Sequence, residues 1–328
     1  SIGVKLKPDD VAFRCNLVTI REKDGSDVME DYSAGHISTG EAREIIKSLD
    51  DDQGLSKEGV RFYTGTSYRH LMVWEGAPKG ADKMMLTPAH DISDKTTSAF
   101  LPKGEGADKL IRLMELSRPV LKNHPVNKKR AAEGKKQATS IWLWGQGKAP
   151  AMPTIKDRFG IEGSIISAVD LMKGIGIYAG LEVIKVPGVT GYLDTNYKGK
   201  ADYALASLDS KDFVCVHVEA PDEAGHNGNL KDKLRAIEDF DKEVVSRVLK
   251  GAERFGEFTV LALTDHPTPV RLKTHTSDPV PFALYSGTGG PKKSGVKFSE
   301  PAAKRAAVHI KDAVALIEAF FKSKDRTA

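Results

Sequence analysis

Apolar and polar residues along the chain follow two alternating kinds of spacing. Short runs rich in β-branched and aromatic residues alternate with longer segments in which apolar residues recur every three or four positions. The short runs predict strands at residues 11–20, 60–63, 70–74, 141–144, 182–186, 213–218, 258–263 and 281–285. The longer segments predict helices at about residues 38–49, 107–116, 164–179, 230–249 and 309–321. This alternation favours an α/β fold whose parallel sheet is covered by helices on both faces.

Three local signals refine this pattern. The sequence STGE at residues 38–41 matches a capping box, which predicts that a helix begins there. The runs at residues 213–218 and 258–263 are almost continuously apolar, as in strands buried within a parallel sheet. Residues 122–137 are basic and polar, and they predict a solvated helix end or a linker.

Length and composition are those of an ordinary globular protein. The 328 residues suggest two domains, because a domain has roughly 100–200 residues. The 49 basic and 45 acidic residues leave a formal charge of +4, which implies no nucleic-acid partner. No segment has the roughly 18 apolar residues of a membrane span, and no signal peptide is recognisable. We therefore expect no membrane partner.

The two cysteines, Cys15 and Cys215, both lie in apolar strand-like runs. This placement predicts buried, reduced thiols in a cytoplasmic protein. A disulfide between them remains an alternative that the sequence leaves open, as does the formation of a homo-oligomer.

Polar residues gather at the ends of three predicted strands. They form clusters at residues 219–226, 264–267 and 274–279. In open parallel sheets, functional sites form beyond the carboxyl ends of the strands. We therefore expect the three clusters to come together.

These clusters contain carboxylates and imidazoles that are good metal ligands, namely Asp222, His226, Asp265, His266 and His275. Such a mixture of oxygen and nitrogen donors suits Mn²⁺, Zn²⁺ or a similar divalent ion. Two such ions a few ångströms apart could clamp the attacking and leaving oxygens of a phosphoryl group. For each residue taken alone, a helix cap or a hydrogen-bonded loop position is the competing interpretation.

The same clusters carry a family resemblance. The strings APDEAGHNG, TDHPTP and THTSDPVPF resemble the metal-binding motifs of the alkaline phosphatase superfamily. The strings VAFRCNLVT, TSIWLWGQGKAP and ISAVDLMKGIGIYAGLEVIKVPGVTGYLDTNY resemble its archaeal-type cofactor-independent phosphoglycerate mutases. The resemblance runs through essentially the whole chain.

The resemblance implies a fold and a set of metal ligands. The fold is an alkaline-phosphatase-like sheet with helices on both faces, in a metal-binding domain at residues 138–328. A smaller inserted α/β domain at residues 1–137 would bind substrate. Two divalent ions (Mn, Zn, Co or Mg) are implied, and 2,3-bisphosphoglycerate is not required. Asp222, His226 and His275 would hold one ion, and Asp265 and His266 would contribute to the second.

In this family an Asp and the nucleophilic Ser complete the second metal site. They come from motifs resembling GDGMAD and SDVANLS, and neither string occurs in this chain. We therefore expect that the chain begins just after them, without the first strand–helix units of its second domain. On this interpretation the chain alone is inactive.

The inserted domain supplies candidate substrate-binding residues. His36 lies in a turn similar to the substrate-clamping turn of the larger mutases, although packing near a helix cap would explain it equally. Arg69 resembles an arginine that grips substrate, and its planar fork could bind a phosphate or carboxylate bidentately. The alternative is an arginine stacked on Tyr68 at the surface. Arg14 and Asp91 are weaker candidates, since a strand-face salt bridge would account for Arg14.

Lys200 is the candidate cation for neutralising the transferred phosphoryl group. Lys198 competes for that role, and an exposed lysine is the alternative for either residue. The implied reaction interconverts 3-phosphoglycerate and 2-phosphoglycerate through a phosphoserine, a step of glycolysis and gluconeogenesis, with phosphoglycerate as the small-molecule partner. Two other functions stay open: a phosphatase or phosphotransferase acting on another small phospho-substrate, and a truncated metal-binding protein without catalysis.

Overall fold

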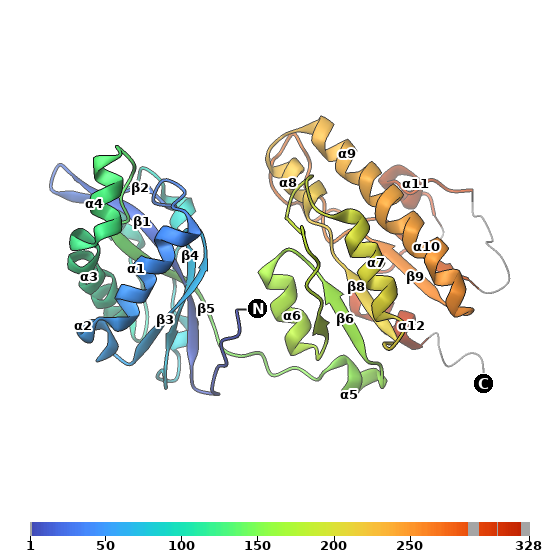
Figure 1. Ribbon diagram of the computed structural model, residues 1–328, viewed down its shortest axis with the longest axis horizontal. Coiled ribbons are helices and arrows are strands. Elements are labelled where there is room, and N and C mark those ends of the chain that lie inside the picture. Colours follow the sequence, from blue (N-terminus) through green and yellow to red (C-terminus); the bar gives the residue numbers. More distant parts are fainter. Residues whose placement is uncertain (1, 288–294, 307, 323–328) are drawn as a thin grey trace. The chain divides into compact units, whose positions relative to one another are not determined.

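The computed structural model describes residues 2–287, 295–306 and 308–322. The chain forms two compact units, Ile2–Ala151 and Met152–Ala328, called here the N-terminal and C-terminal units (Figure 1). Within the described residues, no helix combines the length and apolar character needed to cross a membrane.

A curved antiparallel sheet forms the centre of the N-terminal unit. Its longest strand, β1, pairs with β2 near the end of β1 and with β4 and β5 over its first half, while β3 pairs with β4. The bounds are β1 (Val11–Lys23), β2 (Ser26–Asp31), β3 (Val60–Thr66), β4 (Arg69–Trp74) and β5 (Ser140–Gly147). Because β5 completes this sheet, the unit extends to Ala151, beyond the predicted boundary at residue 137.

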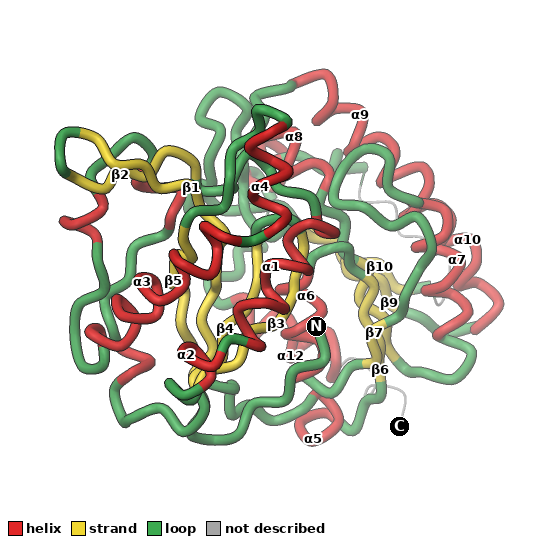
Figure 2. The backbone as a smooth tube through the Cα atoms, turned by 60° about the vertical axis from the view of Figure 1, so that its left-hand side comes forward, coloured by secondary structure: helices red, strands yellow, loops and turns green. Residues whose placement is uncertain are grey.

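Helices line one face of this sheet (Figures 1 and 2). They are α1 (Thr39–Asp51), α2 (Gln53–Ser56), α3 (Ala107–Asn123) and α4 (Pro125–Ala132), with short 3-10 turns at Ala81–Lys83, Ala89–Ile92 and Thr97–Phe100. Phe13 and Cys15 of β1 join the helices in one core. Side chains alternate along a strand, so Arg14 and Asn16 lie on the opposite face, where Arg14 is exposed.

The capping box predicted at Ser38 is confirmed, since the hydroxyl of Ser38 accepts from the amide of Glu41 and the carboxylate of Glu41 accepts from the amide of Ser38. The solvated helix end or linker predicted at residues 122–137 is confirmed at residues 131–136, which are exposed at and after the end of α4, but it is wrong for the buried residues before them. Helix α3 runs on to Asn123 and α4 follows directly. The side chains of Asn127 and Arg130 are buried, and their polar groups bond to the backbone carbonyls of Ala138 and Ala34.

The C-terminal unit contains one parallel and one antiparallel set of strands. Strand β6 (Gly163–Ile166) lies between β7 (Glu182–Val183) and β8 (Phe213–Val216), all parallel, and β9 (Thr259–Leu263) is antiparallel to β10 (Phe282–Ser286). Within the described residues these two sets form separate sheets. The side chains of β8, and those of β9 except the exposed Leu263, are half-buried, whereas the sequence predicts full burial.

Helices of this unit surround its strands (Figure 1). They are α5 (Ile155–Phe159), α6 (Asp170–Tyr178), α7 (Tyr197–Ser207), α8 (Ala220–His226), α9 (Leu230–Phe240), a π-helical turn (Asp241–Val245), α10 (Ser246–Ala252), a 3-10 turn (Glu253–Phe255), α11 (Glu300–Lys304) and α12 (Ala313–Lys322). The predicted helix at residues 164–179 is wrong at its start, because β-branched Ile165 and Ile166 pair as strand β6.

We expect the substitution Asn127→Ala to destabilise the N-terminal unit. The amide of Asn127 donates to the carbonyls of Leu121 and Ala138 at 2.9 and 2.7 Å, and its oxygen accepts from the amide of Ala138 at 3.0 Å. Leaving such buried groups unpaired costs about 1–3 kcal/mol. Denaturant unfolding measures the loss. Asn123→Ala is the control, because that exposed amide donates to the carbonyl of Pro119 within its own helix. Equal destabilisation by the two variants would contradict a structural role for the buried amide.

Candidate active site

The candidate metal ligands all follow or precede strands of the C-terminal unit. Helix α8 starts shortly after β8 and carries Asp222 in its first turn and His226 in its last. Residues four apart on a helix lie on the same face. Asp265 and His266 follow β9, and His275 lies in the loop that leads to β10.

The loop between β9 and β10 is held against α8 and α9 by backbone contacts. The carbonyl of Lys273 lies 3.1 Å from Nδ1 of His226, and the ammonium of Lys233 donates to the carbonyl of Thr268 at 2.6 Å. Within the loop, the amide of Thr276 donates to the carbonyl of Pro267 at 3.1 Å. An irregular segment thereby acquires a defined position beside α8.

The five predicted ligands form one connected cluster. Nε2 of His226 lies 2.9 Å from Nε2 of His275 and 3.3 Å from a carboxylate oxygen of Asp222. The other oxygen of Asp222 is 3.4 Å from His275 and 3.9 Å from His266, and Asp265 is 3.4 Å from His266. Ligand atoms of Asp222, His266 and His275 all lie within 4.8 Å of one another. Residues from three separate segments therefore converge on one small volume.

The donor set of this cluster fits a divalent cation. A carbonyl oxygen can only accept, so in the neutral ring Nδ1 of His226 carries the proton and Nε2 presents a lone pair to the cluster. Metal-bound histidines commonly donate their second ring nitrogen to a backbone carbonyl in this way. The hydroxyl of Thr268 donates to Asp222 and orients that carboxylate.

Lys200 is fully buried, so the alternative of an exposed lysine is wrong for this residue. Its ammonium donates to the carbonyl of His217 at 2.8 Å, and burial lowers its pKa to about 8. Lys198 is exposed and lies 3.9 Å from Glu243. Burial thus distinguishes the two lysines, while their roles stay predictions.

Two residues next to Lys200 were not among the predicted site residues. His217 lies 3.0 Å from the hydroxyl of Ser167 through Nδ1 and 3.3 Å from Glu219 through Nε2. Burial, with further contributions from the charges of Asp222 and other nearby acids, raises the pKa of Glu219. The alternating polar positions in VHVEAPD are the sequence signal that points to this pair.

The candidate substrate-binding residues of the N-terminal unit gather around an aromatic cluster. The guanidinium of Arg14 lies 4.7 Å above the ring of Trp144, and that of Arg69 lies 4.4 Å above the ring of Tyr68. The ring centroid of His36 is 6.1 Å from that of Tyr68. Within the described residues neither guanidinium forms an ion pair, so the strand-face salt bridge considered for Arg14 is absent.

Asp91 lies at the margin of the same cluster. Its carboxylate is 3.6 Å from Nε2 of His90, whose ring packs edge-on against Trp144 at 5.4 Å. The stacking of Arg69 on Tyr68 agrees with the alternative that the sequence left open for Arg69, whereas the contribution of Tyr32 was not predicted. The result is an exposed face with two cations stacked on rings.

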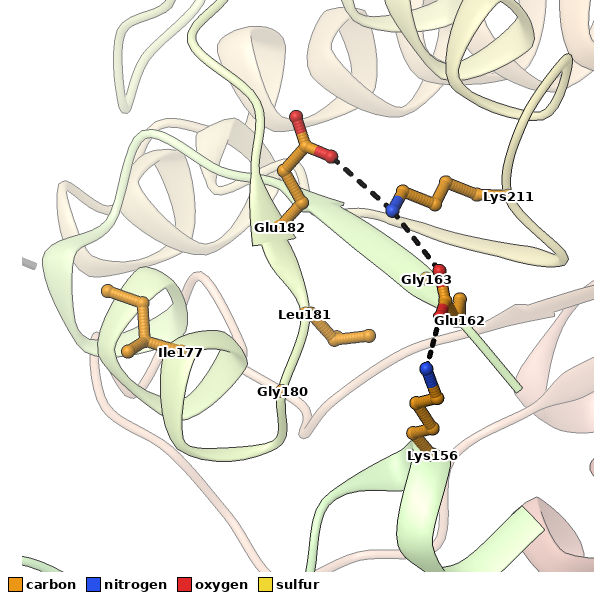
Figure 3. Close-up of a pocket in the computed structure, with 8 residues that line it drawn as sticks. All are labelled: Lys156, Glu162, Gly163, Ile177, Gly180, Leu181, Glu182 and Lys211. Atoms are coloured by element: carbon orange, nitrogen blue, oxygen red, sulfur yellow. Dashed lines mark hydrogen bonds and ion pairs between the residues drawn. The ribbon is translucent and has the colours of Figure 1, made fainter. Parts of the chain in front are cut away.

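A cavity of about 440 Å³ lies elsewhere in the C-terminal unit, at the amino end of β6 (Figure 3). Figure 3 shows its two lysines already paired, Lys156 with Glu162 and Lys211 with both Glu162 and Glu182. The candidate metal ligands Asp222 and His226 instead follow the carboxyl end of β8. We therefore do not assign the candidate chemistry to this cavity.

The sequence is closely similar to those of known proteins. A family model described as 2,3-bisphosphoglycerate-independent phosphoglycerate mutase matches residues 1–127. Over 97% of this chain and 78% of the relative, the chain is 52% identical to a probable enzyme of that name from Geobacter sulfurreducens. It is 53% identical to the enzyme of that name from Methanosarcina acetivorans, with the same two coverages of 97% and 78%.

Solved structures show a similar fold. A protein from Pyrococcus horikoshii matches with a TM-score of 0.73 and 23% identity, covering 93% of this chain and 71% of that one. A cofactor-independent phosphoglycerate mutase from Thermoplasma acidophilum matches with a TM-score of 0.61 and 24% identity, covering 100% and 79%. The predicted alkaline-phosphatase-like α/β fold is confirmed.

The buried ammonium of Lys200 predicts a pH dependence of stability. Its pKa is about 8 in the folded chain and near 10.5 when exposed, so between these values the unfolded chain binds a proton that the folded chain has released. The free energy of unfolding should therefore rise with pH across this window. Denaturant unfolding from pH 8 to 10.5 measures the slope. Lys200→Met should flatten it and Lys198→Met should not; an unchanged slope in Lys200→Met would rule out this assignment.

Proposed function

The chain belongs to the 2,3-bisphosphoglycerate-independent phosphoglycerate mutases, and from this premise we propose a role for each of its units. The reaction of the family is the interconversion of 3-phosphoglycerate and 2-phosphoglycerate. We propose that the C-terminal unit handles the phosphoryl group and that the N-terminal unit binds the glycerate portion. The convergence of Asp222, His266 and His275 at the strand ends is the observation that carries this proposal.

The C-terminal cluster would hold two divalent ions, with Mn, Zn, Co and Mg as the candidates. Asp222, His226 and His275 would bind one, and Asp265 and His266 would contribute to the other. The 3.9 Å approach of Asp222 to His266 brings the two ligand sets next to each other. Bound ions would neutralise charge on the phosphoryl oxygens. Thr268 would keep the carboxylate of Asp222 turned toward the cluster.

Lys200 would add a fixed cation to the same reaction. Its ammonium uses one N–H on the carbonyl of His217, which leaves two further donors. A pKa of about 8 keeps this group mostly protonated at neutral pH. A positive charge in a buried environment stabilises developing negative charge more strongly than one in water. We assign Lys200 the role of stabilising the equatorial oxygens of the transferring group.

The face of the N-terminal unit that carries Arg14 and Arg69, called here the arginine face, would bind an anion. Arg14 and Arg69 are held on aromatic rings, and Arg can present two parallel N–H donors to a carboxylate or phosphate. Because stacking already restricts these side chains, less conformational entropy is lost on binding. His36 would supply a further contact from its turn. Asp91 would accept a hydrogen bond from a glycerate hydroxyl.

Metal binding should stabilise the chain. We expect Mn²⁺ or Zn²⁺ to raise the thermal unfolding midpoint and EDTA to reverse the effect. A ligand that binds only the folded state adds about 2.7 kcal/mol to the free energy of unfolding when its concentration is a hundred times its Kd. His275→Ala should abolish most of the shift. Glu238→Ala, which changes an exposed side chain of α9, is the control. If both variants responded to metal alike, the cluster would not be the binding site.

Substitutions on the arginine face should weaken substrate binding. Hydrogen bonds to charged groups are worth about 1.5–3 kcal/mol, so Arg69→Met should raise the Kd for 3-phosphoglycerate about tenfold or more. Calorimetric titration measures this, with the exposed Arg112→Met as control. Inorganic phosphate is the comparison ligand: if it bound as tightly as 3-phosphoglycerate, a phosphatase of broader specificity would be favoured instead.

A further inference from the structure

The candidate substrate-binding residue His36 is the last residue of a turn with unusual backbone angles. Three consecutive residues, Ala34, Gly35 and His36, have positive φ values of 49°, 66° and 48°. Glycine adopts this conformation readily, whereas Ala and His do so at a cost. Such conformations persist only where the surrounding structure enforces them, and they cluster at functional sites. Contacts with surrounding residues must therefore stabilise this turn.

Arg130 of α4 makes the contact that holds it. Its guanidinium donates through Nη2 to the carbonyl of Ala34 at 2.7 Å, through Nε to the carbonyl of Lys136 at 2.8 Å and through Nη1 to Glu41 at 2.9 Å. The side chain is only 3% exposed. One buried group thus joins the turn to α1 and to the segment before β5.

The turn has little room beside this guanidinium. A Cβ placed on Gly35 would lie 3.1 Å from Cβ of Lys136 and 3.4 Å from Nη2 of Arg130. Glycine at this position therefore lets Arg130 reach the backbone. The close approach indicates that the turn and the arginine fit each other directly.

Hydrogen bonds of Ser33 and Ser67 fix the path of the chain before and after the turn. The hydroxyl of Ser33 accepts from the amide of His36 at 3.1 Å and donates to Asp31 at 2.6 Å. After the turn, the hydroxyl of Ser67 donates to the carbonyl of Ile37 at 2.8 Å. Because Ser67 lies two positions before Arg69, this hydrogen bond also links the turn to the segment that carries Arg69, another candidate substrate-binding residue.

We propose that Arg130 is a positioning residue that holds the left-handed turn 34–36 and thereby places the imidazole of His36 for binding the phosphoglycerate anion. Arg130 is buried beneath the turn and touches no substrate; it acts through His36. This inference rests on the substrate-binding role proposed above for His36. A lysine at this position could reach one acceptor but could not bridge the three that the planar fork joins.

A double-mutant cycle on the full chain tests the proposal. Calorimetric titration with 3-phosphoglycerate is carried out on Arg130→Met, His36→Ala and the double variant. Because misplacing a binding group costs much of its contribution, Arg130→Met should raise the Kd about tenfold, nearly as much as His36→Ala. The double variant should bind no worse than His36→Ala alone, since Arg130 acts through that side chain. Additive losses would overturn the proposal.

Controls separate positioning from loss of fold. Arg130→Lys should recover part of the affinity, and Arg112→Met, in an exposed ion pair of the same unit, should leave it unchanged. NMR of the backbone amide and ring of His36 gives a readout independent of substrate. If His36→Ala left binding unchanged, the proposed substrate role would fail, yet shifted His36 signals in Arg130→Met would still support positioning. Unshifted signals in a folded Arg130→Met variant would refute it.

Discussion

The candidate metal cluster depends on an irregular loop being held against a helix. The helix α8 can align only Asp222 and His226, because only residues one turn apart share its face. His266 and His275 come from the irregular loop between β9 and β10. The contacts of Lys233 with Thr268 and of His226 with Lys273 give this loop a position. Because α8 and α9 hold the loop beside Asp222 and His226, the conformation of the loop and the geometry of the candidate cluster are set together.

Much of the site's composition could be predicted from sequence. Strand ends, imidazoles and carboxylates are visible as short motifs, and all five candidate ligands chosen in this way lie in one cluster. The rule that parallel strands present their carboxyl ends at one edge led to this grouping. Within the described residues, however, β8 and β9 lie in separate sheets, and contacts of the loop with α8 and α9 bring the residues together. The capping box at Ser38 was equally visible, because its hydrogen bonds involve residues three positions apart.

Features that depend on distant partners were not visible. The basic composition of residues 122–137 predicted solvent exposure, yet Arg130 is buried because Glu41 and the carbonyl of Ala34 surround it. The local spacing predicts a helix at the start of β6, because the strand partners of β6 come from β7 and β8 and leave no mark on that spacing. The ring of Trp144 beneath Arg14 likewise comes from a strand far along the chain, β5, which pairs with β1. The spacing of residues along the chain does not indicate contacts of this kind.

The position of β5 in the N-terminal sheet has a consequence for the order of folding. Strand β1 lies near the start of this unit, but one of its neighbours is β5, and the hydroxyl of Thr19 bonds to Gln137, 118 positions later. As the chain leaves the ribosome, this unit cannot close its sheet until almost all of it has emerged. Pairing over such separations slows folding, because a long loop must be ordered first. Until β5 emerges, the edge of β1 that pairs with it would therefore keep unpaired backbone N–H and C=O groups. Such unpaired strand edges make incomplete folds prone to aggregation, which chaperones counteract.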